Sequence, residues 1–133
     1  MPMIPVGTIA WATMAPGFKP PGPHPVLVVQ AFPNGNLGLA FITHSSDLLR
    51  VGLPLRRSDC PSAFRERGGP LSDEDGVIAL VDDRGCKRIA IATPIDSGCV
   101  RIGTIEVTLT RVVHLSDDVW LPLRLRIRTA LGF

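Results

Sequence analysis

Short runs of apolar residues, broken by glycine, proline and polar turns, make up most of this 133-residue chain. The first run, residues 6–14, has the apolar, β-rich character of a buried strand. Two further runs, 26–30 and 37–43, stand on either side of Asn34-Gly35, which is a strong signal for a tight turn. The pattern therefore predicts one N-terminal strand and, after it, a β-hairpin.

The rest of the chain continues this pattern less regularly. Shorter runs predict strands over 47–55, 77–81, 88–93 and 100–115, with 77–81 and 88–93 paired around a polar turn. Residues 120–129 alternate between apolar and basic side chains, which is typical of a strand. One face would carry Leu123, Leu125 and Ile127, and the other would carry Arg124, Arg126 and Arg128.

Composition narrows the fold class. The chain holds 13 prolines and 13 glycines, and a proline inside a helix costs about 3 kcal/mol, so a long helical bundle is excluded. About seven short strands with no clear amphipathic helix favour a single domain of the small all-β barrel class. The sequence lacks both the apolar stretch of a membrane helix and the features of a signal peptide, so we expect a soluble cytoplasmic protein without a membrane partner.

Two segments are predicted to be long loops. Residues 15–25 contain five prolines, which exclude helix and remove backbone donors. Residues 56–76 are polar, and a loop of that length in a compact domain usually has a function or is mobile.

The charged residues are unevenly distributed. Residues 1–83 carry 6 basic and 8 acidic side chains, whereas residues 84–133 carry 8 basic and 4 acidic ones. Twelve of the 14 basic residues are arginine, which suits bidentate contacts with phosphate, so a nucleic-acid partner is allowed but not required. The three cysteines, Cys60, Cys86 and Cys99, cannot all pair in disulfide bonds, and their spacing is not that of metal ligands. We therefore expect reduced thiols, no metal and no cofactor.

Several segments, taken in order, resemble a known family. They are Gly-Thr-Ile-Ala-Trp at 7–11, His-Pro before aliphatic residues at 24–29, Gly-Leu-Ala-Phe-Ile-Thr at 38–43, Asp-Gly-Val-Ile-Ala-Leu-Val-Asp at 75–82 and Arg-Ile-Gly-Thr-Ile at 101–105. Their order and spacing are similar to those of the MazF/PemK (Kid-like) toxin ribonucleases, over about residues 5–106. The resemblance implies an SH3-like barrel, usually a homodimer, that cleaves single-stranded RNA without a metal and is blocked by an antitoxin protein. Residues 107–133 lie outside the resemblance, and we expect them to form an atypical β-rich C-terminal extension.

The resemblance also indicates the site residues. The catalytic arginine of the family is replaced here by His24, and its catalytic threonine corresponds to Thr43. An imidazole transfers protons near neutral pH but cannot clamp phosphate permanently, so an active enzyme and a catalytically weakened relative both remain open. His44, next to Thr43, is a second candidate for proton transfer. The expected substrate-binding residues are Lys19, Ser45, Ser46, Arg56, Arg57, Arg65 and Arg67.

Other interpretations remain open for the same residues. The arginines of 56–67 would also fit a solvated loop balanced by Asp59 and Glu66, and Trp11 would serve as either a base-stacking platform or a core residue. The alternative function is a non-enzymatic all-β assembly protein, such as a phage head, tail or capsid decoration component. Its long loops would then be docking arms, and the Leu/Arg strand would pair with a neighbour. A plain protein-binding SH3-like module is a third alternative.

Overall fold

The computed structural model describes residues 4–14, 24–43, 52–71, 76–81, 87–96 and 98–132. Its strands are β1 (Thr8–Met14), β2 (His24–Ala31), β3 (Leu37–Thr43), β4 (Leu53–Leu55), β5 (Gly76–Ala79), β6 (Ala90–Asp96), β7 (Cys99–Ile102) and β8 (Ile105–His114). Two 3-10 turns, η2 (Pro61–Ala63) and η3 (Arg65–Arg67), follow β4, and the helix α1 (Asp117–Leu131) ends the described chain.

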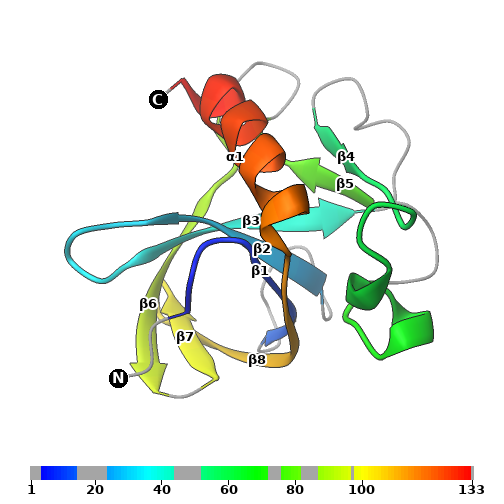
Figure 1. Ribbon diagram of the computed structural model, residues 1–133. Helices are drawn as coiled ribbons and strands as arrows, with labels where there is room; N and C mark the ends of the chain where they lie inside the picture. Colours follow the sequence, from blue (N-terminus) through cyan, green and yellow to red (C-terminus); the bar gives the residue numbers. More distant parts are fainter. Residues whose placement is uncertain are drawn as a thin grey trace.

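Six of these strands close into an antiparallel barrel. The strand order is β2-β1-β8-β7-β6-β3, and pairing of β2 with β3 completes the ring (Figure 1). β5 and β4 continue the sheet outward from β3. The predicted small all-β barrel is therefore confirmed.

The predicted hairpin is β2–β3. Gly35 at its tip has a φ of +91°, and the side-chain oxygen of Asn34 accepts a hydrogen bond from the backbone of Asn36 at 3.0 Å. This is the backbone geometry that made Asn-Gly a turn signal, because glycine adopts positive φ without steric strain. The turn sets the pairing of the strands, with Val26 opposite Phe41.

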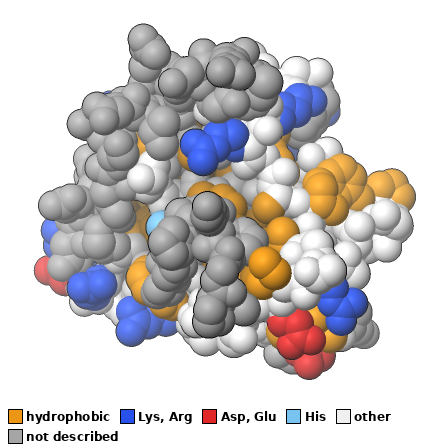
Figure 2. Space-filling view, turned by 180° about the vertical axis from the view of Figure 1, so that it is seen from behind, with side chains coloured by type: hydrophobic (Ala, Val, Ile, Leu, Met, Phe, Trp, Pro, Cys, Tyr) orange, Lys and Arg blue, Asp and Glu red, His pale blue; other side chains and the backbone are white. Residues whose placement is uncertain are grey.

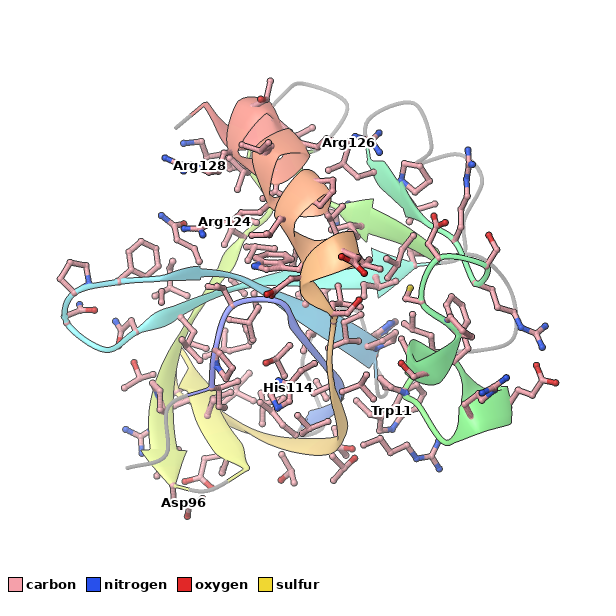
Figure 3. All side chains as sticks on the ribbon, viewed as in Figure 1. Trp11, Asp96, His114, Arg124, Arg126 and Arg128 are labelled. Carbon is pink, nitrogen blue, oxygen red and sulfur yellow. The ribbon has the colours of Figure 1, made fainter. Side chains whose placement is uncertain are left out.

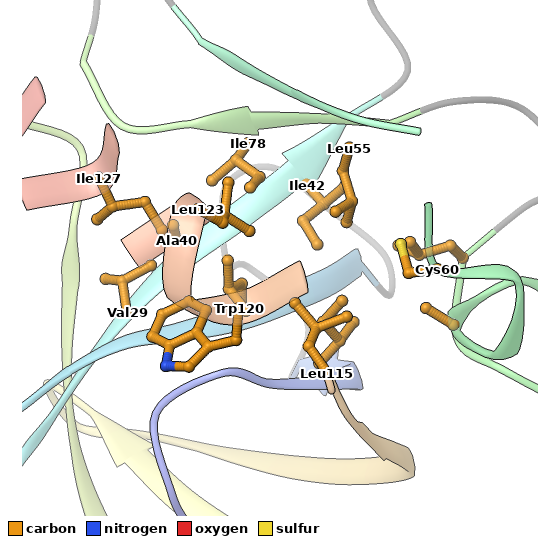
Figure 4. Close-up of a cluster of buried hydrophobic side chains, with 14 of the residues drawn as sticks. Val29, Ala40, Ile42, Leu55, Cys60, Ile78, Leu115, Trp120, Leu123 and Ile127 are labelled. Atoms are coloured by element: carbon orange, nitrogen blue, oxygen red, sulfur yellow. The ribbon is translucent and has the colours of Figure 1, made fainter. Parts of the chain in front are cut away.

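The hairpin is buried on both faces, which explains its continuous apolar sequence. Val26, Val28 and Leu39 point into the barrel interior. Alternate residues point outward, where α1 and the segment after β4 cover them (Figure 4). This outer cluster includes Leu27, Val29, Ala40, Ile42, Phe64, Trp120, Leu123, Ile127 and Leu131.

The described part of the loop predicted over 56–76 holds two short 3-10 turns, and it is not polar throughout. Cys60, Ala63, Phe64 and Leu71 are all buried in the outer cluster. Backbone hydrogen bonds between Ala63, Arg65 and Leu71 fix the two 3-10 turns around Phe64. Each of these apolar residues fills the same core.

Strand pairing also differs from expectation in the middle of the chain. β5 and β6 do not form a hairpin with each other, because both pair with β3, at its C-terminal and N-terminal halves respectively. Among the described residues, an isolated bridge between Val81 and Lys87 joins the segment after β5 to the segment before β6. The expected single strand over 100–115 is divided by a turn at Gly103 into β7 and β8, and β8 continues past residue 106 as a barrel strand. Of the strand expected over 47–55, the structure has β4, and residues 47–51 lie outside the described chain.

The prediction of a C-terminal strand is wrong, because residues 117–131 form the helix α1. Its buried residues are Trp120, Leu123, Ile127 and Leu131, which are spaced by three and four positions as on one face of a helix. Leu125, which the strand pattern placed beside Leu123, is 67% exposed. The β-rich extension expected for 107–133 is therefore a barrel strand followed by a helix.

Helix signals were present beside the alternating pattern. Ser116 occupies the N-cap position, Asp117 and Asp118 lie in the first turn, and Gly132 ends the helix with a φ of +80°. Pro122 lies inside α1, although a proline in a helix interior destabilises the helix by about 3 kcal/mol. Burial of four large apolar side chains, at about 1.5–3 kcal/mol each, outweighs that cost.

Gly7 lies directly against the Trp120 ring of α1. Its φ is +87°, and a Cβ at this position would lie 2.9 Å from the Trp120 ring. We expect Gly7→Ala to lower the free energy of unfolding by about 2–4 kcal/mol, since it adds backbone strain to a steric clash. Urea denaturation measures the loss.

The matched control is Gly35→Ala. Gly35 has a similar φ of +91°, but nothing lies within 4 Å of its Cβ position, so only the backbone strain applies. Equal losses at the two positions would contradict tight docking of Trp120 on Gly7.

Candidate functional site

His24 and Thr43 lie at the same end of the β2–β3 hairpin. His24 begins β2 and Thr43 ends β3. The recorded β2–β3 pairing at this end stops at Val26 and Phe41, two residues before His24 and Thr43. His24 pairs with Ala12 on β1, and Thr43 pairs with Val77 on β5, so the two residues share an end of the barrel.

The His24 ring packs against an aromatic neighbour on β3. It meets Phe41 edge to face, with ring centroids 6.2 Å apart and an interplanar angle of 84°. Its Nε2 is buried and has no hydrogen-bond partner among the described residues. A buried polar atom without a partner costs about 1–3 kcal/mol, and such atoms are often found where a ligand supplies the missing partner.

Thr43 is half-buried and pairs with Val77 on β5. His44, Ser45, Ser46 and Lys19 lie outside the described residues. Of the three expected catalytic residues, the structure describes His24 and Thr43, at the same end of β2 and β3, and their catalytic role stays a prediction.

The expected substrate-binding arginines are spread around the segment after β4. Arg57 forms an ion pair with Glu66, which fits the balanced-loop interpretation for this residue. Arg65 and Arg67 are exposed on η3. Arg56 borders a cavity whose other wall is α1, and neither His24 nor Thr43 lines that cavity. Figure 2 shows the molecule from behind, and on this face the described Lys and Arg side chains form separate groups and no continuous patch.

A second polar pair, between β1 and β8, was not anticipated. The Thr8 hydroxyl lies 2.8 Å from His114 Nδ1 in a hydrogen bond, and Thr8 is only 1% exposed. The pair borders a cavity of about 250 Å³ at the barrel end, with Ile4 and Val28 in its wall. Thr8 and His114 are 106 residues apart and meet only because β1 and β8 pair, so no local sequence signal could have revealed them.

Trp11 is half-buried and belongs to neither core cluster, so the expectation of a core role is wrong. The guanidinium of Arg111 lies over its ring, 6.0 Å from the centroid (Figure 3). Trp120 is the tryptophan that fills the core.

Comparison with protein-family models, curated proteins and solved structures finds no match to this chain.

The described residues contain no group of three or more His, Cys, Asp or Glu side chains suited to a metal ion. Among the described residues, Cys60 and Cys99 form no disulfide bond. Desolvation and the carboxylates of Asp96 and Glu106 raise the pKa of Cys99, which keeps this thiol protonated and a poor nucleophile or ligand. Within the described chain, no helix has the length and apolar character needed to cross a membrane.

Proposed function

We propose that this protein binds single-stranded RNA at the His24–Thr43 end of the barrel and cleaves it without a metal. The observation that carries the proposal is the buried, unpartnered Nε2 of His24 at the start of β2, at the same end of the hairpin as Thr43, which ends β3. The resemblance to the MazF/PemK family supports the same pair of positions. It further implies an antitoxin protein that covers the site, a homodimer, and action in the cytoplasm.

In this mechanism His24 Nε2 accepts the proton of a ribose 2′-hydroxyl, whose oxygen attacks the adjacent phosphorus. The bond from phosphorus to the 5′-oxygen breaks, and that oxygen takes up a proton from water. The products are a 2′,3′-cyclic phosphate and a 5′-hydroxyl. The Thr43 hydroxyl donates a hydrogen bond to a phosphate oxygen and orients it. Because position 24 lacks the permanent charge of arginine, we expect slower turnover than an arginine-containing site would give.

The direct test incubates the purified protein with a single-stranded oligoribonucleotide in the presence of EDTA. We expect fragments that end in a cyclic phosphate, and no cleavage of the same sequence with a 2′-deoxyribose at the cut position. Intact RNA from a protein that is folded by circular dichroism would refute the nuclease proposal and leave the fold unaffected.

One observation favours the alternative of an assembly protein. Leu121 and Leu125, one turn apart on the outer face of α1, are 51% and 67% exposed. In an antiparallel pair of α1 helices centred at the level of Leu123, Leu121 of one copy lies opposite Leu125 of the other. The same arrangement brings Asp118 opposite Arg128, so the helix is self-complementary in charge. The fitting partner for this face is therefore a second copy of the chain.

This contact predicts a weak dimer, because two leucines per copy bury far less than the roughly 800 Å² per partner of a stable interface. We expect Leu121→Asp/Leu125→Asp to sediment as a monomer at concentrations where the native protein associates. Ile91→Asp, which changes an exposed apolar residue on β6, is the control and should leave association unchanged. Association that persists in the leucine variant would exclude α1 as the contact.

A further inference from the structure

The two flanks of α1 differ in charge. Arg124 and Arg128 are four residues apart and project from the same flank, over β2 (Figure 3). Arg126 projects from the opposite flank toward β4 (Figure 3). The helix thus divides three arginines, which a strand would have placed on one face, into a pair and a single residue.

The paired arginines border a cavity of about 300 Å³ between α1 and β2. Its remaining wall is formed by Val6, Val29, Gln30 and Ala31. No carboxylate lines it, and neither Arg124 nor Arg128 is ion-paired in the part of the chain that the structure describes.

Arg126 provides the contrast on the same helix. The cavity on its flank also contains the carboxylates of Asp59 and Asp118, which balance its charge and that of Arg56. An anion would therefore be repelled there by two carboxylates, but would meet only positive charge at Arg124 and Arg128.

The cavity between α1 and β2 combines three kinds of contact. Two guanidinium groups one helical turn apart present forked donors that match phosphate oxygens. The Gln30 carboxamide adds a donor and an acceptor, and the side chains of Val6 and Val29 give an apolar wall. We propose that this cavity binds the phosphate group of a nucleotide or of a nucleic-acid backbone, with the less polar sugar against the valines.

The cavity is at the opposite end of β2 from His24. Six residues separate Gln30 from His24, which corresponds to about 20 Å along a strand. The proposal therefore goes beyond the RNA-cleaving site and does not depend on it.

The test compares Arg124→Gln/Arg128→Gln with Arg126→Gln as a matched control on the same helix. Probes are adenosine monophosphate, inorganic phosphate and a fluorescently labelled single-stranded oligoribonucleotide, measured in dilute solution where α1 does not self-associate. All three arginines are exposed, so both variants should have the same melting temperature as the native protein. We expect the double variant to lose at least about tenfold in affinity, and the control to stay within about twofold of native.

The probes separate the two sources of phosphate. Weaker binding of the mononucleotide and inorganic phosphate as well as of the RNA identifies a free phosphate group as the ligand. If only RNA binding weakens, the ligand is the nucleic-acid backbone. The slope of log affinity against log salt concentration should then fall by an amount that corresponds to about two phosphate contacts. Equal effects of the double variant and Arg126→Gln, or no binding of any probe by the native protein, would overturn the proposal.

Discussion

Replacement of His24 by alanine is expected to lower the rate of RNA cleavage by about 10²–10⁴-fold, the usual contribution of a general acid or base. The free energy of unfolding should change by no more than about 2 kcal/mol, because two effects oppose each other. Removal of the unpartnered Nε2 relieves about 1–3 kcal/mol, and loss of the contact with Phe41 costs about 0.5–1.5 kcal/mol. Rates come from single-turnover cleavage of a labelled oligoribonucleotide, and stability comes from urea denaturation.

His114→Ala is the matched control, because His114 is also on a barrel strand but pairs with Thr8. Its removal leaves the buried Thr8 hydroxyl without this partner and should destabilise the fold by about 1–3 kcal/mol, with cleavage unchanged. Thr43→Val should reduce cleavage without a comparable loss of stability. Native-like cleavage by the His24 variant would remove this residue from the mechanism.

Truncation of Leu123 to alanine is expected to lower the free energy of unfolding by about 2–5 kcal/mol, as for other buried leucines. The same truncation at Leu125 should change it by less than about 0.5 kcal/mol, since this side chain is 67% exposed. Both values are measured by urea denaturation in dilute solution, where association through α1 does not contribute.

This pair of variants distinguishes a helix from a strand over residues 117–131. On a strand, Leu123 and Leu125 would share one face and should lose similar stability. On α1 they are about 160° apart around the axis, so only Leu123 reaches the outer cluster. Similar losses at both positions would contradict the helix.

The position of His24 and Thr43 at one end of the barrel was predictable because it depends on one hairpin. Once Asn34-Gly35 sets the turn and 26–30 pairs with 37–43, His24 and Thr43 lie at matching strand ends. The missing hydrogen-bond partner of His24 Nε2 was not predictable, because it depends on how the ring packs against Phe41. The hydrogen bond between Thr8 and His114 also required closure of the barrel.

By itself, the sequence determined the all-β barrel class and the β2–β3 hairpin, because strand alternation and turn chemistry act over a few residues. It did not determine α1, since Leu-Arg alternation and the spacing of Trp120, Leu123 and Ile127 are both present in the same segment. The tertiary structure decided between them for a physical reason. The closed ring leaves β2 and β3 paired on both sides, whereas the outer apolar face of this hairpin has to be covered, and a helix covers it. That choice also determined which arginines stand together.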